Sequence, residues 1–587
     1  MAFFYGEPYK YWNRDMKKES DFESFKRRLC FLLTLTIMVF GTSPFFLASG
    51  QTQHEIKLVV QITVDGLRGD LLNRYGSHFG KKGFRLLLKK GTVYTNAHYQ
   101  HANTETIVGH TTLATGAFPS EHGMIGNVWF DTDSKTLGYN IEDPDCPMLP
   151  SREVSTTGDQ VDPSQKMSRT DGRSPKAILA PTFSDSLAAY YGGRSKIFAV
   201  SAKDRGAVPM AGQVGKAFWF SVNNGDFVTS SYYYERYPEW VKKWNALRLA
   251  EAYAGKSWSL LNDKPTYLLG AQDDRAYETD LKGFGRVFPH SFGDAGNQLL
   301  YTQILASPVG DQLLLDFSKD LIVNEALGRD EFPDYLSISF SSVDVINHFF
   351  GPSSLESEDI VVQLDHTLAD LFAFVDKNVG LKHTLLILSS DHGMADMPEY
   401  MTALGFSSHR LYPDTIVDST NEIGQKLFNI EDVVRFFYRP YLYLHEEKIQ
   451  AAKLDLKYVE QQIAATLTEK EGIALAVSQS GLPPLQATQL LKQVQNNFHH
   501  SRSGNIYIIQ EPYWFLFDKG PVAGMHGSPW RYDTHVPIVF MGPDIDSQTI
   551  HRLVHPVDVS PTIAAYLGMT PPGSAQGDLL NEVLSEK

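Results

Sequence analysis

Three short apolar runs that lead into segments carrying aspartate constrain the fold of this chain more than any other feature. The runs cover residues 57–64, 335–340 and 384–390. Asp65 and Asp391 follow their runs directly, and Asp344 lies four residues beyond the second run. Such runs are typical of strands buried in a parallel sheet, and residues 360–375 repeat apolar positions at helical spacing. The sequence therefore predicts a strand–helix–strand unit, with the aspartates beyond the carboxyl ends of the strands, where such sheets bind ligands.

The composition narrows the class of protein. The chain has 587 residues, of which 42% are hydrophobic and 21% charged, a balance that excludes intrinsic disorder. Its formal net charge of −15 argues against a nucleic-acid-binding surface or an anionic-membrane surface, because both require a basic face. The two cysteines, Cys30 and Cys146, are too few for a disulfide framework or a cysteine-rich zinc module. No role follows for Cys146.

The N-terminus has the pattern of an export signal. Basic residues 26–28 lead into an apolar run at 29–40, and a stretch of small residues ends near Gly50. We predict that residues 1–50 are a cleaved signal peptide and that the protein is periplasmic or secreted. The alternative is an uncleaved N-terminal anchor, because the apolar run approaches the roughly 20 residues that span a bilayer; we expect no other membrane contact. Met16, which precedes two lysines, is an alternative start.

Residues 51–587 are predicted to form one catalytic domain with two insertions. The first insertion, at about 128–330, is rich in Tyr, Trp, Gly and Asp and fits the strand–helix alternation poorly. The second, at about 420–510, includes a charged amphipathic helical segment. We expect both insertions to form subdomains that cap the sheet.

Six carboxylate and imidazole side chains have the chemistry of metal ligands. They are Asp65, Asp344, His348, Asp391, His392 and His526. Asp344 and His348 are four residues apart, which places them on one face of a helix. Each motif alone also fits a structural role, such as a helix N-cap for Asp65. Together they suit a pair of ions such as Zn²⁺ or other divalent metals, and two ions close together stabilise the attacking and leaving oxygens of a phosphoryl transfer.

Seven motifs, in order along the chain, resemble those of the alkaline phosphatase superfamily. They are residues 65–68 (DGLR), 103–116 (NTETIVGHTTLATG), 122–127 (HGMIGN), 344–352 (DVINHFFGP), 391–394 (DHGM), 526–529 (HGSP) and 557–563 (VDVSPTI). Within the superfamily, the chain looks most like the secreted phosphate-irrepressible alkaline phosphatases, which have a threonine nucleophile. The resemblance runs from Val59 to about Pro572. It implies a three-layer α/β/α sandwich with a mostly parallel central sheet and inserted cap subdomains.

The resemblance also implies the roles of individual residues. It implies one zinc ion bound by Asp65, Asp391, His392 and Thr106, and a second bound by Asp344, His348 and His526. Thr106 would be the nucleophile, activated because a bound metal lowers the pKa of its hydroxyl. On its own, Thr106 also fits a helix N-cap or a buried structural hydroxyl.

Three further residues are implied in binding the phosphoryl group. Asn127 would donate to a non-bridging oxygen, and Lys203 and Arg205 match the segment where monoesterases of this group carry a lysine and an arginine. These two residues are two apart, so on an extended segment both side chains would point to the same side. Extra cationic donors favour a doubly charged monoester over a singly charged diester. Taken alone, a Lys-Asp-Arg triplet is more often a solvated charge cluster.

These observations predict an exported, metal-dependent alkaline phosphatase. It would release inorganic phosphate from small-molecule phosphate monoesters through a phosphothreonine intermediate. The alternatives are a nucleotide pyrophosphatase/phosphodiesterase of the same superfamily and a catalytically inactive binding protein with this fold. The sequence has neither the Gly-x-Ser-x-Gly run of a serine hydrolase nor a P-loop. It does not specify the physiological ester, and we expect a monomer.

Overall fold

The computed structural model describes residues 55–131, 134–151, 165–482, 488–520 and 522–584. The predicted signal peptide at 1–50 lies outside the described residues. Across the described ranges, we find no helix that is both long and apolar enough to span a bilayer.

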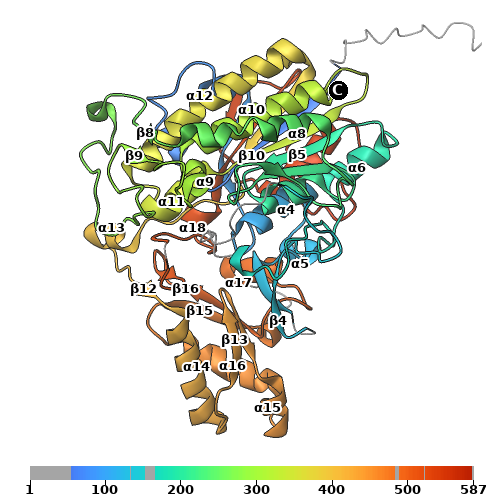
Figure 1. Ribbon diagram of the computed structural model, residues 1–587. Coiled ribbons are helices and arrows are strands. Elements are labelled where there is room, and N and C mark those ends of the chain that lie inside the picture. The colour runs from blue at the N-terminus through green and yellow to red at the C-terminus, as the bar shows by residue number, and fades with distance from the viewer. Residues whose placement is uncertain (1–54, 132–133, 152–164, 483–487, 521, 585–587) are drawn as a thin grey trace, which may run out of the picture. The chain divides into compact units, whose positions relative to one another are not determined.

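A nine-stranded sheet forms the centre of the fold (Figure 1). Its order is β19 (Gln548–Ile550), β2 (Thr92–His98), β18 (His535–Met541), β11 (Thr384–Ser389), β1 (Leu58–Val64), β10 (Asp334–Phe340), β5 (Ile197–Ser201), β6 (Lys216–Phe220) and β7 (Phe227–Val228). The five strands from β11 to β6 are parallel, whereas β18 and β7 run antiparallel to their neighbours. The three predicted strands are β1, β10 and β11, and the predicted α/β class with a mostly parallel sheet is confirmed.

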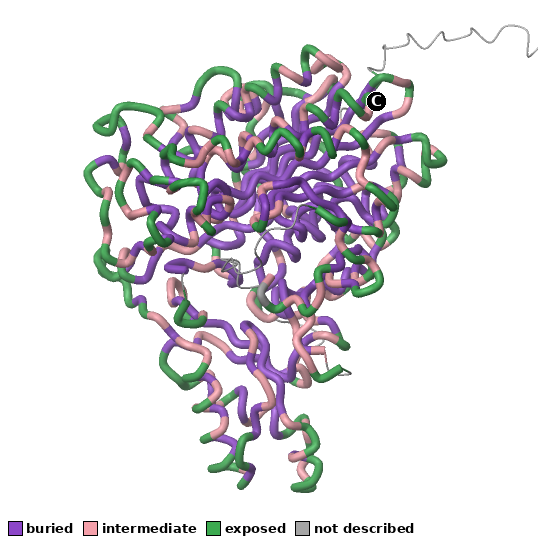
Figure 2. Tube along the Cα trace, in the orientation of Figure 1, coloured by how far each residue is buried: buried purple, intermediate pink, exposed green. Residues whose placement is uncertain are grey.

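Helices cover both faces of the sheet. One core contains side chains of α3 (Phe84–Lys90), α10 (Pro308–Asn324), α11 (Ser342–Phe350) and α12 (Leu355–Asn378). The other contains side chains of α4 (Thr106–Thr115), α6 (Phe183–Tyr190), α7 (Asp204–Ala211) and α19 (Val559–Tyr566). Successive residues of a strand face opposite sides, so Val60 of β1 joins the first core and Val59 the second. Figure 2 shows the resulting buried centre, in which every residue of β1 is buried.

Helix α4 lies close against the segment that follows β11, and a glycine permits the approach. A Cβ atom on Gly109 would be only 1.9 Å from the carbonyl oxygen of Asp391. Any larger residue would therefore push the helix away from this segment. Because Thr106 begins the same helix, this contact sets how the threonine stands relative to Asp391.

A second, four-stranded antiparallel sheet forms a subdomain of its own. Its order is β13 (Val434–Tyr438), β14 (Tyr441–Leu444), β16 (Ile506–Gln510) and β15 (Ile473–Ser478). Helices α14 (Pro413–Phe428) and α16 (Leu456–Thr468) share a hydrophobic core with it. Its other face packs on Ala102, Ile125 and Phe130 of the main body. The expected insertion at about 420–510 falls within this subdomain.

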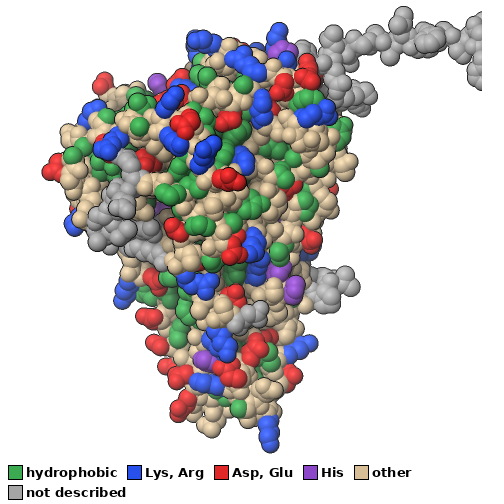
Figure 3. Space-filling model, turned by 45° about the vertical axis from the view of Figure 1, so that its right-hand side comes forward, with side chains coloured by type: hydrophobic (Ala, Val, Ile, Leu, Met, Phe, Trp, Pro, Cys, Tyr) green, Lys and Arg blue, Asp and Glu red, His purple; other side chains and the backbone are tan. Residues whose placement is uncertain are grey.

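The expectation that about 128–330 form one capping insertion is wrong. Strands β5, β6 and β7 lie in this range and belong to the central sheet. Part of the range does lie outside the central sheet, because β3 (Val128–Asp131) and β4 (Thr136–Tyr139) form a separate hairpin. The aromatic residues that suggest a cap include those of β6, whose side chains are buried within the sheet core. On the face drawn in Figure 3, acidic and basic side chains are interspersed.

Candidate metal centre

The six predicted ligands come together at the carboxyl ends of the central strands. The register aligns Val64 of β1 with Phe340 of β10, so the segments after these strands start side by side. Among the described residues, two groups of side chains have ligand atoms within 4.8 Å of one another. They are Asp344, His348 and His526, and Asp65, Asp344 and His392. Asp344 belongs to both groups, so the two candidate metal positions are adjacent.

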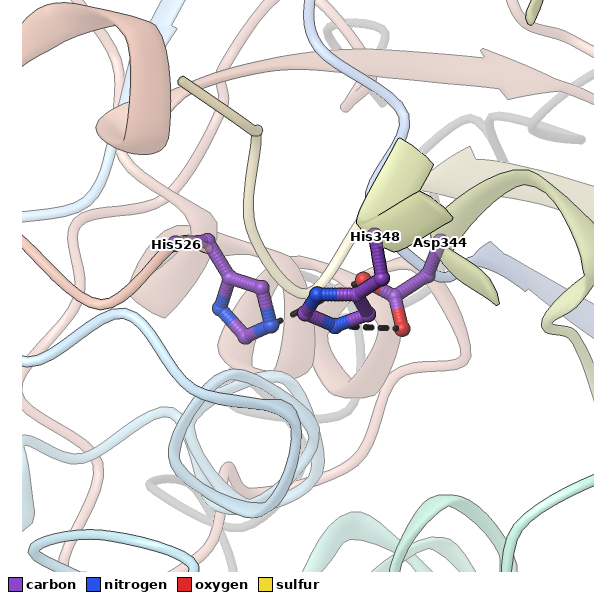
Figure 4. Close-up of side chains that lie close together, drawn as sticks. All are labelled: Asp344, His348 and His526. Carbon is purple, nitrogen blue, oxygen red and sulfur yellow. Dashed lines mark ion pairs between the residues drawn. The ribbon is translucent and has the colours of Figure 1, made fainter. Parts of the chain in front are cut away.

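The first group spans α11 and the segment before α18 (Arg531–Thr534), and Figure 4 shows its three side chains. His348 Nε2 lies 3.4 Å from Asp344 Oδ2, and His526 Nε2 lies 3.6 Å from Asp344 Oδ1. Two tetrahedral ligands about 2.1 Å from one ion would be roughly 3.4 Å apart. The spacing of this group therefore fits ligands that share one ion.

The second group is fully buried. His392 Nε2 lies 3.3 Å from Asp65 Oδ1 and 3.4 Å from Asp391 Oδ2. On the other side of Asp391, His110 Nδ1 lies 3.2 Å from the same Oδ2 atom. The structure thus places Asp391 beside Asp65 and His392, although Asp344 completes the tighter group.

Hydrogen bonds to the backbone set the tautomer of the three histidines. In each ring Nδ1 lies within hydrogen-bonding distance of a carbonyl oxygen, which can only accept. The acceptors for His348, His392 and His526 are the carbonyls of Gly524, Gly393 and Thr104, at 2.8, 2.8 and 2.7 Å. Nδ1 therefore carries a proton in each ring, and Nε2 is the nitrogen that would bind an ion in the site. A second hydrogen bond of this kind is the usual support of a metal-binding histidine.

The buried charged groups of the site shift one another's pKa. Burial and Asp344 oppose ionisation of Asp65, but Lys203 and His392 outweigh them and hold its pKa below the ordinary value. Burial and the charge of Asp65 raise the pKa of Asp391. Burial opposes a charge on His392, yet Asp391 and the other carboxylates raise the pKa of this ring to about 9. The cluster therefore attracts cations, and a bound divalent ion would neutralise it.

Thr106 lies at the first position of α4, after Glu105 in an extended conformation. Its side chain is 1% exposed, and its hydroxyl has no hydrogen-bond partner among the described residues. The N-terminus of a helix favours negative charge, so this position suits an oxygen that becomes an alkoxide. The structural alternative, a hydroxyl that caps a helix, is not what the structure shows, because no cap hydrogen bond is made.

Lys203 and Arg205 are buried, not solvated, but their geometry differs from the prediction. Lys203 has an extended backbone and precedes α7, whereas Arg205 lies in the first turn of that helix. They do not share an extended segment, because the helix begins at Asp204. Asp204 is bound by Arg173, with Nε 2.6 Å from Oδ2, and by the hydroxyl of Tyr139 at 2.7 Å. Burial opposes ionisation of Asp204, but Arg173, Arg205 and the hydroxyl of Tyr139 outweigh it and hold the pKa of this carboxyl below its ordinary value.

A cavity of about 420 Å³ opens beside the candidate metal ligands. Asn127, Lys203, Arg205, Asp344, His348 and His526 line it together with Trp219, Phe349, Phe517 and Met525. The amide oxygen of Asn127 accepts a hydrogen bond from the backbone of Ile107 at 3.2 Å, which leaves its NH₂ group to donate to a ligand. Sequence reasoning missed the apolar wall, because its residues come from separate segments. It also missed Glu105, although this residue lies inside the motif that carries Thr106.

The donor set fits divalent metal ions. Three carboxylates and three imidazoles, with no cysteine, suit zinc and related ions. The buried Nε2 of His392 has no hydrogen-bond partner among the described residues, as expected for a ligand atom. A helix-covered, mostly parallel sheet that carries these groups at its strand ends defines a metal-dependent hydrolase.

Comparison with known proteins identifies the family to which the chain belongs. Residues 59–529 match the model of the family described as type I phosphodiesterase / nucleotide pyrophosphatase. The chain belongs to this family, and the predicted membership of the alkaline phosphatase superfamily is confirmed.

Relatives of known name resemble the chain over nearly its whole length. It is 31% identical to a calcium-transporting ATPase of Myroides odoratus over 92% of this chain and 97% of that protein. It is also 31% identical to the alkaline phosphatase PhoV of Synechococcus elongatus, over 91% and 94% of the two chains. The crystal structure of the alkaline phosphatase PafA is similar with a TM-score of 0.80 and 28% identity, covering 90% of this chain and 99% of that one.

Proposed function

We propose that this protein is an alkaline phosphatase, a metal-dependent phosphomonoesterase that releases inorganic phosphate from small phosphate monoesters. The observation that carries the proposal is the position of Lys203 and Arg205, which line the same cavity as the metal ligands. Two divalent ions and two cationic side chains around one cavity suit a doubly charged phosphoryl group. All six predicted ligands are present, which argues against an inactive binding protein.

The roles of four residues are supported by a solved variant of PafA, 27% identical and similar with a TM-score of 0.81. That variant is changed at a threonine, at an asparagine 21 positions later, and at a lysine and an arginine two positions apart. Thr106 and Asn127 have the same spacing here, as do Lys203 and Arg205. We therefore propose Thr106 as the nucleophile, and the other three residues as groups that bind the phosphoryl oxygens.

The residues suggest a two-step transfer. The first ion would be held by Asp65, Asp391, His392 and Thr106, and the second by Asp344, His348 and His526. When bound, the ions supply Lewis-acid stabilisation of the attacking and leaving oxygens. Thr106 Oγ1 attacks phosphorus from the N-terminus of α4, and the alcohol leaves to give a phosphothreonine. Water then attacks phosphorus in its turn, releases inorganic phosphate and regenerates the threonine.

Asn127, Lys203 and Arg205 would act on the non-bridging oxygens. The NH₂ group of Asn127 donates one hydrogen bond, and its amide is held in place by the backbone of Ile107. The cationic groups neutralise charge that a diester would not carry. Diester cleavage is the second candidate, because the family description includes phosphodiesterases.

We also propose that the protein is exported and that its metals are zinc ions. The leader at 1–50 supports export, and the mixed carboxylate–histidine donors support zinc over harder ions. Metal analysis of the purified protein tests the second proposal.

A matched pair of substrates tests the activity. With an aryl phosphate monoester and the corresponding methyl aryl diester, we expect kcat/KM to favour the monoester by several orders of magnitude. A preference for the diester would replace this proposal with the phosphodiesterase function.

A further inference from the structure

Arg439 connects the second subdomain to the candidate active site. It lies between β13 and β14, at the turn of a hairpin whose strands belong to the four-stranded sheet. Its side chain is only 5% exposed, and its guanidinium lies 5.6 Å from the ring of Phe517, which lines the cavity. A buried arginine normally has partners that offset the loss of its hydration.

Arg439 has two hydrogen-bond acceptors among the described residues, and both belong to segments that form the candidate site. Nη1 donates to the carbonyl oxygen of His526 at 2.7 Å, and Nη2 lies 3.1 Å from Oε1 of Glu105 and donates to it. The other carboxylate oxygen of Glu105, Oε2, accepts the backbone N–H of Asn127 at 2.5 Å. One planar guanidinium thus binds His526, a candidate metal ligand, through Nη1. Through Nη2 it binds Glu105, the residue that precedes Thr106.

The backbone around His526 is shaped for this contact. Gly527 has a φ of +107°, and a Cβ atom there would lie 2.6 Å from Nη1 of Arg439. A larger residue at 527 would displace the guanidinium. His526 also donates from Nδ1 to the carbonyl of Thr104, so the segments at 104–106 and 526–527 brace one another. Arg439 adds a second connection between these two segments, because it donates to both His526 and Glu105.

We infer that Arg439 is a positioning residue for the reaction proposed above. Through His526 it fixes one ligand of the candidate metal site, and through Glu105 it fixes the start of α4 and the backbone of Asn127. Lysine cannot replace it, because one ammonium lacks the fork that binds two acceptors at once. The inserted subdomain therefore contributes to the geometry of the site without touching substrate. This inference rests on the proposed function only where it concerns kcat and KM.

The test compares Arg439→Met and Arg439→Lys with a matched control, Arg502→Met. Arg502 belongs to the same subdomain and also binds the main body, donating to the carbonyls of Gly123 at 2.5 Å and Ala177 at 2.9 Å. Neither acceptor is a candidate ligand. The measurements are kcat and KM for an aryl phosphate, the rate at which Zn²⁺ is lost to a chelator, and the melting temperature of the metal-free protein.

We expect Arg439→Met to lower kcat by about 10–100-fold and to speed Zn²⁺ loss by a similar factor, the usual cost of removing support from a metal ligand. Arg439→Lys should recover only part of either loss. Arg502→Met should change the melting temperature comparably but leave kcat and Zn²⁺ loss within about 3-fold of the unmodified protein. Equal effects of the two arginines on kcat and Zn²⁺ loss would overturn the inference, as would an unchanged Arg439→Met.

A double variant separates positioning from general loss of packing. Glu105→Gln combined with Arg439→Met should cost less in kcat than the product of the single effects, because the two side chains act through one contact. Independent, multiplicative effects would contradict the inference. If the unmodified protein hydrolysed no monoester, the proposed function would fail, and the Zn²⁺-loss comparison would still decide the role of Arg439.

Discussion

Lys203 Nζ lies 2.5 Å from Oδ2 of Asp344, so a buried ammonium contacts the carboxylate that both groups of candidate ligands share. The same ammonium is 2.7 Å from Oδ2 of Asp65. Coordination of a divalent ion by these carboxylates competes with their contacts to the lysine. The geometry therefore links Lys203, the cation proposed to bind phosphate, directly to two candidate metal ligands.

The first prediction follows from this relationship. Lys203→Ala and Arg205→Ala should each lower kcat/KM for an aryl phosphate monoester by about 10²–10³-fold, because each removes a charge that faces the phosphoryl group. The loss for a matched methyl diester, which has one negative charge fewer, should be at least 10-fold smaller. Initial rates with the two esters give the comparison. Equal losses for both would show that these cations do not select the monoester.

The second prediction concerns the nucleophile. Thr106→Ala should lower kcat by at least about 10³-fold, whereas Thr106→Ser, which keeps a hydroxyl, should retain substantial activity. Thr112→Ala is a matched control in the same helix, since the Thr112 hydroxyl bonds to the carbonyl of Val108 inside α4. Rapid-quench experiments with radiolabelled substrate should trap phosphate on the unmodified protein and none on Thr106→Ala. Labelling of the alanine variant would exclude Thr106 as the nucleophile.

How far the sequence predicts this site depends on the range of the contacts. Asp65 directly follows a buried strand and Asp391 lies two residues beyond another, so their positions follow from local patterns and from the alignment of parallel strands. The backbone of Lys203 and Arg205 is not the single extended segment that the sequence predicts, since neither residue signals that a helix begins between them. Arg439 and Glu105 are 334 positions apart, and no local periodicity links such residues.

The domain boundaries also depend on contacts between distant segments, which local sequence patterns do not reveal. β10, α12 and β11 alternate in the regular way and were predictable as one unit. β5 and β6 are five residues each, and a long stretch of chain that includes α10 separates them from β10, so their place in the sheet depends on tertiary pairing. Short strands of this kind carry too little periodicity to distinguish a sheet edge from a cap.

The third prediction concerns metal removal. A chelator should abolish hydrolysis and lower the melting temperature, because an ion that binds only the folded protein stabilises it by mass action. Zn²⁺ added back should restore both. His348→Ala should weaken Zn²⁺ binding at least about 10-fold, and His366→Ala, at an exposed position of α12, should not. Full activity of a sample shown by elemental analysis to be metal-free would exclude a metal-dependent reaction.

The fourth prediction concerns pH and a buried carboxyl group away from the metal ligands. Glu278 is 5% exposed; Oε2 accepts the backbone N–H of Arg275 at 2.9 Å, and Oε1 has no hydrogen-bond partner among the described residues. Burial, Glu356 and Asp273 oppose its ionisation more than Arg275 favours it, and they raise its pKa to about 8.

Between its ordinary pKa of 4.5 and about 8, the folded protein keeps a proton that the unfolded chain has lost. The stability that this group contributes is therefore complete below pH 4.5 and is lost as the pH rises through 8. Glu278→Gln, which cannot ionise, should match the unmodified protein in free energy of unfolding near pH 5. Near pH 9 it should be the more stable by on the order of 2 kcal/mol, a value reduced for screening by water. Urea unfolding at the two pH values measures the difference, with Glu331→Gln at an exposed position as the control. A stability gain that is the same at both pH values would show that ionisation of Glu278 is not its cause.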